Sequence, residues 1–304
     1  MKFVLGVDAG GTSTRAMAVA ADGTVLGTGR AGGANPNSHP PEEAVANLAA
    51  AIRAAHPEPA GASACVIGMA GTAKLTDPVV AALFDRTWRA LGLDPVVILT
   101  DAEVAFASAT DAPDGTVLIA GTGSIAGRIR GHRMVATEGG YGWLLGDEGS
   151  GFWLGREAVR ATLAALGRDA ELGPLATAVL AEAGVDPADR RLAWRRLITV
   201  ANAEAPIRLA RFAPLVAVAD PAAADIVERA ADLLVATALA TRDPGEDSPI
   251  VLVGSVLGED TRVGARVRAK LAGLDVRASS DGVLGAAWLA AVEAFGEDLA
   301  RRPG

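Results

Sequence analysis

The feature that most constrains the fold of this chain is a glycine turn between two strand-like apolar runs, which occurs twice. The first copy is VDAGGTSTRAMAV at residues 7–19, and the second is TVLIAGTGSIAGRI at residues 116–129. Gly11 and Gly121 lie 110 positions apart, and a threonine and a nearby serine follow each of them. A chain that folds the same unit twice can face the two turns across one cleft.

The rest of the chain alternates strand-like and helix-like patterns, separated by Gly- or Pro-containing breaks. In the first half the pattern predicts strands at 3–8, 14–20, 24–29, 63–69 and 95–99 and helices near 42–55 and 78–91. In the second half it predicts three strands within 116–136, mainly helices over 151–242, strands at 249–254 and 274–277, and helices at 260–271 and 282–296. A strand meander combined with strand–helix units predicts an α/β protein.

The composition limits the partners of this chain. Its 304 residues, half of them hydrophobic, are enough for one large or two medium domains with a substantial core. The net charge of −8 and the pI near 5.0 argue against a broad basic surface, so we expect neither nucleic acid nor a membrane as partner. Small molecules are the expected partners.

Cysteine and histidine usage excludes several kinds of site. Cys65 is the only cysteine, so this chain alone cannot form a disulfide, a CxxC zinc site or a four-thiolate cluster. The three histidines are well separated in sequence. The N-terminus does not resemble a signal peptide, and no uncharged apolar run reaches the roughly 18 residues of a membrane span. We therefore predict a cytoplasmic protein.

The first glycine turn has two readings. Gly10 and Gly11 could simply form a hairpin, since glycine adopts positive φ without strain. Alternatively, their bare backbone amides could approach a polyphosphate, with the Thr12 and Ser13 hydroxyls donating to phosphate oxygens. Asp8, at the end of the strand, would then hold a hydrated Mg²⁺ ion. No Gly-Lys-Ser/Thr follows, so the turn is not a Walker A loop.

A carboxylate precedes the second turn. Asp101 closes a short apolar strand and opens a helix, where it could act only as an N-cap. It also lies where transfer of phosphate to an alcohol needs a group that accepts the hydroxyl proton. The AGTGS segment at 120–124 would then be a second phosphate loop. The paired turns with an intervening aspartate favour phosphoryl transfer.

The stretch GGYGWLLGDEGSGFW at 139–153 is the most unusual in the chain. Trp153 lies at helical spacing and reads as a core residue, whereas Trp143 lies within the glycine run. Asp147 and Glu148 could simply start a helix, because acids are favourable at that end of the helix dipole. Alternatively, Asp147 could accept hydrogen bonds from sugar hydroxyls, since fixed acceptors discriminate well between polyols.

Together these segments resemble a known family. The succession VDAGGTST, GANPNS, GMAGTA, TDAEVAFASAT, IAGTGSIAGRI, GGYGWLLGDEGSGFW and VLVGSVL resembles the N-acetylglucosamine kinases of the BadF/BadG/BcrA/BcrD group, within the sugar kinase/Hsp70/actin superfamily. The resemblance covers nearly the whole chain. It implies a duplicated ribonuclease-H-like, actin-like ATPase fold of two domains, with ATP and sugar in the interdomain cleft and closure on sugar binding.

The resemblance also implies roles for individual residues. Asp101 matches the aspartate taken as catalytic base, and Asp8 belongs to the first phosphate motif, where it would order Mg²⁺. The nucleotide-binding residues that it implies are Gly10, Gly11, Thr12 and Ser13 in the first phosphate motif, Gly121, Thr122, Gly123 and Ser124 in the second, and Gly254 and Ser255 in the adenosine motif. The sugar-binding residues that it implies are Asn35, Ala70, Gly71, Asp101, Gly140, Tyr141, Gly142, Trp143 and Asp147.

Two positions depart from the animal members of the family. Ala70-Gly71-Thr72 carries fewer hydroxyls than the serine-containing segment of those members, which bears on recognition of an acyl group. A histidine follows their sugar-binding asparagine, whereas here Pro36 follows Asn35 and His39 comes later. The phosphate motifs and the base are intact.

The resemblance predicts an N-terminal domain over 1–110, joined by a C-terminal helix at 282–298, and a C-terminal domain with a helical insertion over 111–281. A homodimer is expected, as is common in the group. The predicted activity is ATP-dependent phosphorylation of the 6-hydroxyl of N-acetylglucosamine.

Three alternatives stay open. A kinase of glucosamine or N-acetylmuramic acid would use the same motifs. A BadF-type ATPase activator would need cysteines for an iron–sulfur cluster, which the lone Cys65 disfavours. A sugar sensor that binds without catalysis would typically add a DNA-binding region, which we do not expect here.

Overall fold

The computed structural model describes residues 2–168, 171–279 and 281–304, so the part of the predicted helical range at 169–170 lies outside it. It groups the chain into two compact units. Unit 1 comprises Met1–Asp114, Ile129–Met134 and Ser279–Gly304, and unit 2 comprises Gly115–Arg128 and Val135–Ala278. The end of the first long segment of unit 1, Asp114, lies four residues beyond the boundary predicted at 110.

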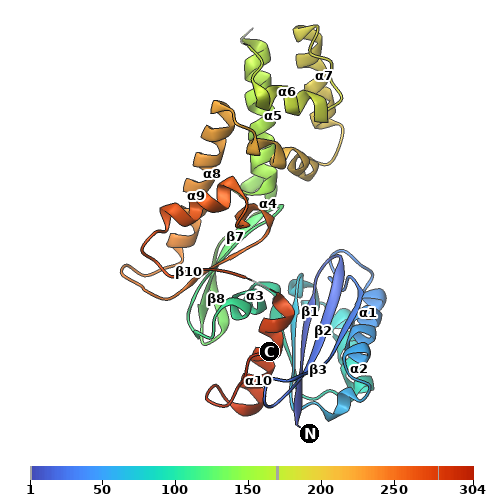
Figure 1. Ribbon diagram of the computed structural model, residues 1–304. Coiled ribbons are helices and arrows are strands. Elements are labelled where there is room, and N and C mark those ends of the chain that lie inside the picture. The colour runs from blue at the N-terminus through green and yellow to red at the C-terminus, as the bar shows by residue number, and fades with distance from the viewer. Residues whose placement is uncertain (1, 169–170, 280) are drawn as a thin grey trace. The chain divides into compact units, whose positions relative to one another are not determined.

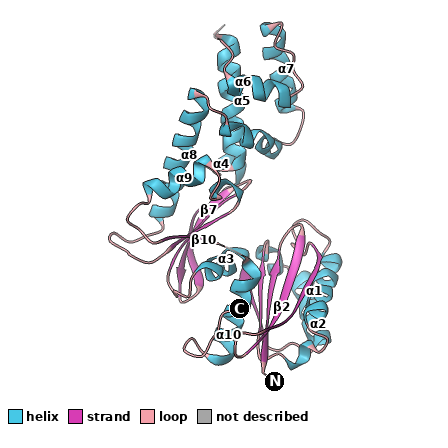
Figure 2. Cartoon of the chain, viewed as in Figure 1, coloured by secondary structure: helices cyan, strands magenta, loops and turns pink. Residues whose placement is uncertain are grey.

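Unit 1 is built on a five-stranded sheet (Figures 1 and 2). Its strands are β1 (Phe3–Ala9), β2 (Ser13–Ala20), β3 (Val25–Gly32), β4 (Cys65–Met69) and β5 (Val96–Thr100), in the spatial order β3-β2-β1-β4-β5. β1, β2 and β3 form the predicted antiparallel meander, and β4 and β5 continue parallel to β1. The predicted strands of this half are therefore confirmed.

Helices cover both faces of this sheet. They are α1 (Pro41–Ala55) and α2 (Pro78–Leu91) on one face and α3 (Asp101–Ala109) and α10 (Gly282–Phe295) on the other. The alternation along β1 explains the two layers, because Leu5 and Val7 pack with α1 and α2 whereas Val4 packs with α3 and α10. Burial of both faces accounts for the nearly continuous apolar sequence of this strand.

Unit 2 repeats the strand order of unit 1. Its strands are β6 (Gly115–Ala120), β7 (Ser124–Arg130), β8 (Arg133–Gly139), β9 (Ile250–Val253) and β10 (Val276–Ala278), in the order β10-β9-β6-β7-β8. In each sheet the first strand is central, with the second and third strands on one side and two later strands on the other. β9 runs parallel to β6 and to β10. The predicted duplicated α/β fold is confirmed.

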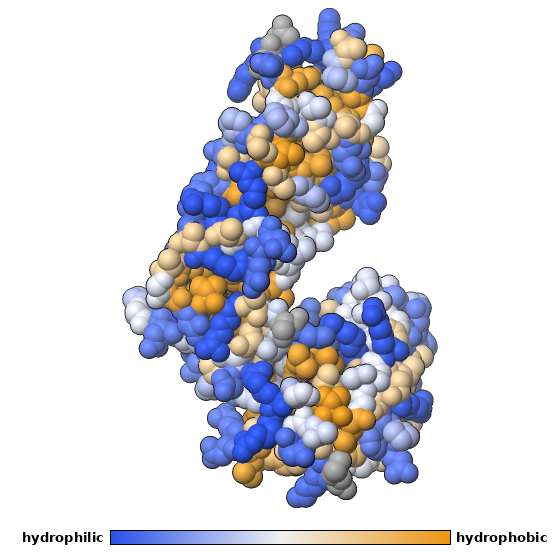
Figure 3. Space-filling view, in the orientation of Figure 1, coloured by the Kyte–Doolittle hydropathy of each residue, from blue (hydrophilic) through white to orange (hydrophobic). Residues whose placement is uncertain are grey.

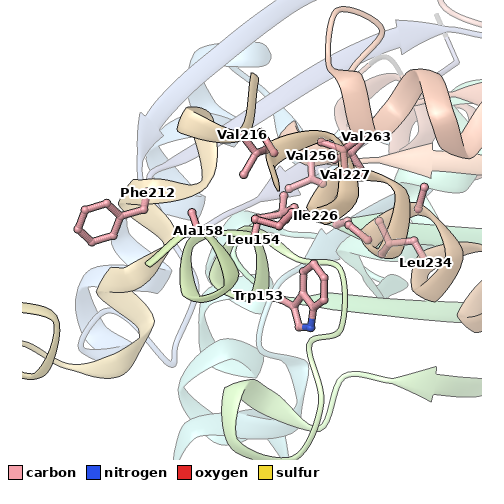
Figure 4. Close-up of a cluster of buried hydrophobic side chains, with 14 of the residues drawn as sticks. Trp153, Leu154, Ala158, Phe212, Val216, Ile226, Val227, Leu234, Val256 and Val263 are labelled. Atoms are coloured by element: carbon pink, nitrogen blue, oxygen red, sulfur yellow. The ribbon is translucent and has the colours of Figure 1, made fainter. Parts of the chain in front are cut away.

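Helices make up most of unit 2. They are α4 (Gly142–Leu145), α5 (Gly151–Gly167), α6 (Pro174–Glu182), α7 (Arg190–Asn202), α8 (Pro221–Ala240) and α9 (Arg262–Lys270), with 3₁₀ segments η3 (Pro206–Ala217) and η4 (Ser255–Leu257). Figure 4 shows their core, in which Trp153 and Leu154 of α5 lie among side chains of η3, α8, η4 and α9. Trp153 is 4% exposed, which confirms the prediction of a core residue.

The surface mixes hydrophilic and apolar residues on the face shown in Figure 3. Among the described residues, no helix is both long enough and apolar enough to cross a bilayer.

The packing of α10 in unit 1 depends on glycine. A Cβ built on Gly285 of α10 would overlap the Val104 carbonyl oxygen and lie 2.6 Å from the Ser108 amide nitrogen of α3. A Cβ on Gly6 of β1 would likewise overlap the backbone of α10 at Ala287. These contacts are with backbone atoms, which cannot rotate away as a flexible side chain can.

We predict that Gly285→Ala lowers the free energy of unfolding by about 1–3 kcal/mol, because the added methyl group forces α10 away from α3. The matched control is Gly167→Ala at the end of α5, where the nearest atom to an added Cβ is 3.8 Å away. Alanine there should raise stability by about 0.5–1 kcal/mol through helix propensity. Thermal unfolding followed by circular dichroism measures both. Equal melting temperatures for the two variants would contradict the packing argument.

Candidate functional site

Three parallel strands of unit 1 end at one edge of the sheet. β1, β4 and β5 are in register there, with Ala9 beside Met69 and Met69 beside Thr100. The carboxyl ends of parallel strands are where open α/β sheets bind ligands. Asp8, Gly71 and Asp101 all lie at this edge, so the fold brings the predicted metal, sugar and base residues of unit 1 together.

The structure corrects the cap of α3. Its N-cap is Thr100, whose hydroxyl accepts from the Glu103 amide at 3.3 Å, while Glu103 Oε2 accepts from the Thr100 amide at 2.6 Å. This capping box satisfies the free amides of the first turn, so the N-cap reading of Asp101 is wrong. Asp101 stands one position later, with Oδ1 accepting from the Ala102 amide at 3.0 Å and its side chain exposed. N-capping of α3 therefore does not explain this carboxylate.

Two carboxyl groups of this edge have raised pKa values. Surrounding protein removes water from Asp101, which raises its pKa, and the negative charge of nearby Asp8 raises it further. Burial also raises the pKa of Asp8, against the lowering effect of Arg15. Carboxyl groups that resist ionisation and lie close together are typical of sites for proton transfer.

Sequence reasoning missed Arg15 and Asp281. Arg15 lies on β2 directly opposite Asp8, and its Nη2 forms an ion pair with Asp8 Oδ2. Its Nη1 donates to Oδ2 of Asp281 at 3.0 Å, and Asp281 also caps α10 through the Val283 amide at 3.1 Å. Hairpin register could have paired Arg15 with Asp8, because residues on either side of a tight turn face each other. The contact with Asp281, 266 residues away, had no local signal.

The first glycine loop, Gly10–Thr12, is not a turn that requires glycine. Gly10 and Gly11 do lie in the turn of the β1–β2 hairpin, but neither has a positive φ, so the turn conformation does not explain why they are glycines. A Cβ on Gly11 would meet only the Ser38 hydroxyl, at 3.9 Å. The Gly10 carbonyl accepts from the amides of Ala34 at 3.0 Å and Asn35 at 3.2 Å. Neither backbone strain nor packing demands glycine here, which leaves an open approach to the backbone.

Asn35 lies against the segment that follows β4. Its Oδ1 accepts from the Asn37 amide at 2.8 Å, and a Cβ on Gly71 would overlap that oxygen. Gly71 has φ +79°, a conformation that favours glycine. Ala70 is joined to β1 by a hydrogen bond from its amide to the Ala9 carbonyl at 3.1 Å. The predicted sugar residues Asn35, Ala70 and Gly71 thus lie next to one another.

The second glycine loop, Gly121–Gly123 of unit 2, corrects the spacing of the repeat. β1 ends at Ala9 and β6 ends at Ala120, so equivalent residues lie 111 positions apart rather than 110. Gly10 then corresponds to Gly121 and Ser13 to Ser124. This register removes the irregular position of the second serine.

The start of α5 donates hydrogen bonds to the second loop. The Gly121 carbonyl accepts from the Gly151 amide at 2.7 Å, and the Thr122 carbonyl accepts from the Phe152 amide at 3.1 Å. Neither Gly121 nor Gly123 has a positive φ. A Cβ on Gly121 would meet nothing within 4 Å. This loop therefore also exposes bare backbone.

Asp147 supports the second loop. It is 7% exposed, has φ +58°, and accepts from the Ser124 amide through Oδ1 at 3.0 Å. A Cβ on Gly123 would lie 2.7 Å from this oxygen, so Gly123 is required by the close approach.

Trp143 differs from the buried Trp153. It is 40% exposed, and its ring makes an edge contact with Phe152.

Gly254 and Ser255 lie beside the second loop within unit 2. Gly254 has φ +100°, and a Cβ there would lie 2.5 Å from the Ala120 carbonyl oxygen and 3.2 Å from the Gly121 nitrogen. Ser255 borders a mainly apolar pocket of about 330 Å³, also lined by Leu154, Val216 and Arg262. A pocket of this kind can take a flat, partly apolar group such as a nucleobase.

The predicted site residues thus form two groups. Unit 1 holds Asp8, Gly10, Gly11, Thr12, Ser13, Asn35, Ala70, Gly71 and Asp101, and unit 2 holds Gly121, Thr122, Gly123, Ser124, Gly140, Tyr141, Gly142, Trp143, Asp147, Gly254 and Ser255.

Cys65 is a core residue. It lies in β4, within the strand predicted at 63–69, and its burial raises the pKa of its thiol to about 12. Such a thiol stays protonated and unreactive. Within residues 2–168, 171–279 and 281–304, no three His, Cys, Asp or Glu side chains gather into a metal-binding group.

Known proteins are similar to this chain in sequence and fold. A curated N-acetylmuramic acid/N-acetylglucosamine kinase from Clostridium acetobutylicum is 35% identical over 173 residues, which are 54% of each protein, so the chain matches about half the length of this relative. The solved structure of a proposed N-acetylglucosamine kinase from Chromobacterium violaceum is 28% identical, with a TM-score of 0.71 over 95% of this chain and 99% of that one. Another from Porphyromonas gingivalis is 25% identical, with a TM-score of 0.65 over 93% and 96%.

A family model gives the assignment. The model of the BadF/BadG/BcrA/BcrD ATPase family matches residues 5–290, which include both glycine loops, Asp101 and the Gly254-Ser255 segment. The chain belongs to the BadF/BadG/BcrA/BcrD ATPase family.

Proposed function

We propose that this protein is an ATP-dependent amino-sugar kinase that phosphorylates the 6-hydroxyl of N-acetylglucosamine. One observation carries the proposal. Two glycine loops whose carbonyls accept hydrogen bonds from neighbouring segments stand at equivalent places in the repeat, and Asp101, at the edge of the first, is not the N-cap of its helix. The names of the relatives point in the same direction.

The loops are suited to phosphate groups. In a trans peptide the carbonyl of one residue and the amide of the next point in opposite directions. Because the carbonyls of Gly10, Gly121 and Thr122 are bonded from behind, the following amides of Gly11, Thr122 and Gly123 face the other way. Amides bared in this manner bind phosphate oxygens. We propose that both loops bind the ATP phosphates, with the Thr12 and Ser13 hydroxyls assisting. The predicted Ser124 hydroxyl is buried and donates to the Glu148 carbonyl at 2.8 Å, so Ser124 would support the second loop instead of binding phosphate itself.

Asp8 is the residue that we propose for Mg²⁺. Gly282 leaves room above its carboxylate, since a Cβ there would lie 3.0 Å from Asp8 Cγ. Carboxylate oxygen suits this ion, which commonly keeps several waters and takes further ligands from substrate phosphates. When bound, Mg²⁺ would neutralise charge on the phosphates. Asp8 would hold it from the protein side, while Arg15 keeps the carboxylate oriented.

Asp101 is the proposed general base. A carboxylate that is exposed, yet close enough to other protein atoms and to Asp8 to have a raised pKa, can accept a proton from a bound alcohol. Asp101 would take the proton of the sugar 6-hydroxyl as its oxygen attacks the γ-phosphorus of ATP. The bond from phosphorus to the β,γ-bridging oxygen breaks, which gives ADP and the sugar 6-phosphate.

The remaining predicted residues would bind the sugar and the nucleoside. The sugar would contact Asn35, Ala70 and Gly71, which border the edge of the sheet that carries Asp101. It would also contact Gly140–Trp143 and Asp147. The adenosine would contact Gly254 and Ser255. Asp147 Oδ1 already accepts from the Ser124 amide, which leaves Oδ2 as the freer acceptor for a sugar hydroxyl. The mechanism requires the sites of both units to meet at one ATP molecule across the predicted cleft, which stays a prediction, as does the homodimer.

N-acetylmuramic acid is the second candidate substrate. The specific reason is the name of the Clostridium acetobutylicum relative, an N-acetylmuramic acid/N-acetylglucosamine kinase. A coupled assay of ADP release over N-acetylglucosamine, N-acetylmuramic acid, glucosamine, N-acetylmannosamine and glucose tests the proposal. We expect the fastest release with N-acetylglucosamine. No sugar-dependent release with any of the five would refute the kinase function.

Asp101→Asn tests the general base. We expect kcat to fall by about 10²–10⁴-fold, because asparagine keeps the size of the side chain but cannot accept the proton. Sugar binding, measured by calorimetry, should remain detectable. The matched control is Asp77→Asn at the N-cap of α2, where asparagine also caps well. A D101N variant with near-normal turnover would exclude this role.

The pH dependence of kcat/KM for the sugar gives a separate prediction. The general base acts only when ionised, so activity is lost as the pH falls through the pKa of Asp101. Since that pKa is raised, the acid limb should lie above the usual range of aspartate. Circular dichroism over the same pH range controls for unfolding. A profile that stays flat down to the ordinary pKa of aspartate would contradict this assignment.

A further inference from the structure

His39 contacts the first glycine loop. Its Nε2 lies 2.7 Å from the Gly11 carbonyl oxygen, and its Nδ1 lies 3.3 Å from Glu43 Oε1 on α1. A carbonyl oxygen can only accept a hydrogen bond, so Nε2 carries the proton in this contact. When Nδ1 also carries a proton, the imidazole joins the loop to the first turn of α1 through Glu43.

This contact determines which way one peptide faces. The amide of Thr12 belongs to the same peptide group as the Gly11 carbonyl and points in the opposite direction. With the carbonyl held by His39, the Thr12 amide faces away from the segment that carries His39. If this peptide turned over, the carbonyl oxygen would point where a phosphate binds and would repel it.

The glycine at position 33 makes room for the contact. A Cβ on Gly33 would lie 2.5 Å from His39 Nε2 and would also overlap the Gly11 carbonyl oxygen. Gly33 has no positive φ, so alanine is compatible with its backbone, and the nearest conflicts are with Gly11 and His39.

In the second loop the equivalent carbonyl also accepts a hydrogen bond, but from a main-chain amide instead of a side chain. Under the register of 111, Gly11 corresponds to Thr122, whose carbonyl accepts from the Phe152 amide at 3.1 Å. The start of α5 thus supplies main-chain donors to both carbonyls of its loop. In unit 1 only the Gly10 carbonyl is held by main-chain amides, those of Ala34 and Asn35, and His39 supplies the donor for Gly11.

We propose that His39 is a positioning residue for the phosphoryl donor, which fixes the Gly11–Thr12 peptide with its amide toward the ATP phosphates. This inference rests on the proposed function for the identity of the ligand. His39 itself touches neither substrate, and it acts through the loop.

Three substitutions at His39 separate this role from a merely structural one. The side-chain nitrogen of glutamine takes the place of Nε2, and that of asparagine takes the place of Nδ1. We expect H39Q to keep KM for Mg-ATP within about threefold of wild type, and H39N and H39A to raise it about tenfold or more, the scale of one lost hydrogen bond. KM for the sugar should change little. His56→Gln, which removes a ring stacked on Phe3, is the matched control.

Gly33→Ala tests the same contact with the histidine retained, and it should raise KM for Mg-ATP as H39A does. Melting temperatures identify any variant that is misfolded. If Gly33→Ala or H39A is misfolded, the comparison of KM for Mg-ATP between H39Q and H39N tests the proposal. Equal values for H39Q and H39N, whether normal or impaired, would overturn the proposal.

Calorimetric binding of Mg-ATP to the same full-length variants separates the two claims. A wild type that binds Mg-ATP but phosphorylates no sugar would refute the kinase function, while weaker binding to H39N than to H39Q would still support the role of His39. A difference in turnover without any difference in Mg-ATP binding or KM would overturn it.

Discussion

One structural constraint orients both glycine loops: their carbonyl oxygens accept hydrogen bonds from neighbouring segments. Each repeat has a short loop between its first two strands, and in each loop two consecutive carbonyl oxygens accept hydrogen bonds from neighbouring segments. The planar trans peptide then turns the next amides the other way. A Cβ on Gly11 would meet only the Ser38 hydroxyl, at 3.9 Å, and one on Gly121 would meet nothing within 4 Å, so a ligand can approach the backbone of both loops. The donors differ, a helix start in one unit and a strand end with a histidine in the other.

The second constraint is the shared edge of parallel strands in unit 1. Only β4 lies between β1 and β5 in the sheet, so residues at the ends of these two strands lie close together in space although they are about 90 positions apart in sequence. This edge carries the metal candidate Asp8 and the base candidate Asp101. The capping box of Thr100 and Glu103 starts α3 and leaves the Asp101 carboxylate exposed. Because Thr100 and Glu103 cap the helix, the adjacent Asp101 can present a free carboxylate at the start of α3.

Much of this could be predicted from the sequence. Strand alternation, glycine turns and helix periodicity located nearly all elements, because these signals are local. The errors were local ambiguities with a physical cause. Thr100 and Asp101 are both good N-caps, but the T-x-x-E spacing of Thr100 and Glu103 favours Thr100, and the structure forms that capping box. The repeat offset was wrong by one because Gly11 and Gly121 look alike in sequence. Arg15 with Asp281 and His39 with Gly11 are tertiary contacts, for which the sequence pattern has no signal.

The central claim is transfer of the γ-phosphoryl group of ATP to the 6-hydroxyl of an N-acetylated amino sugar. Its most direct test is incubation of the full chain with Mg-ATP and N-acetylglucosamine, followed by ³¹P–¹H correlation spectroscopy of the product. The account predicts a phosphorus signal coupled to the two protons on C6, together with an equal amount of ADP. Coupling to the anomeric proton, or formation of inorganic phosphate in place of a sugar phosphate, would contradict it.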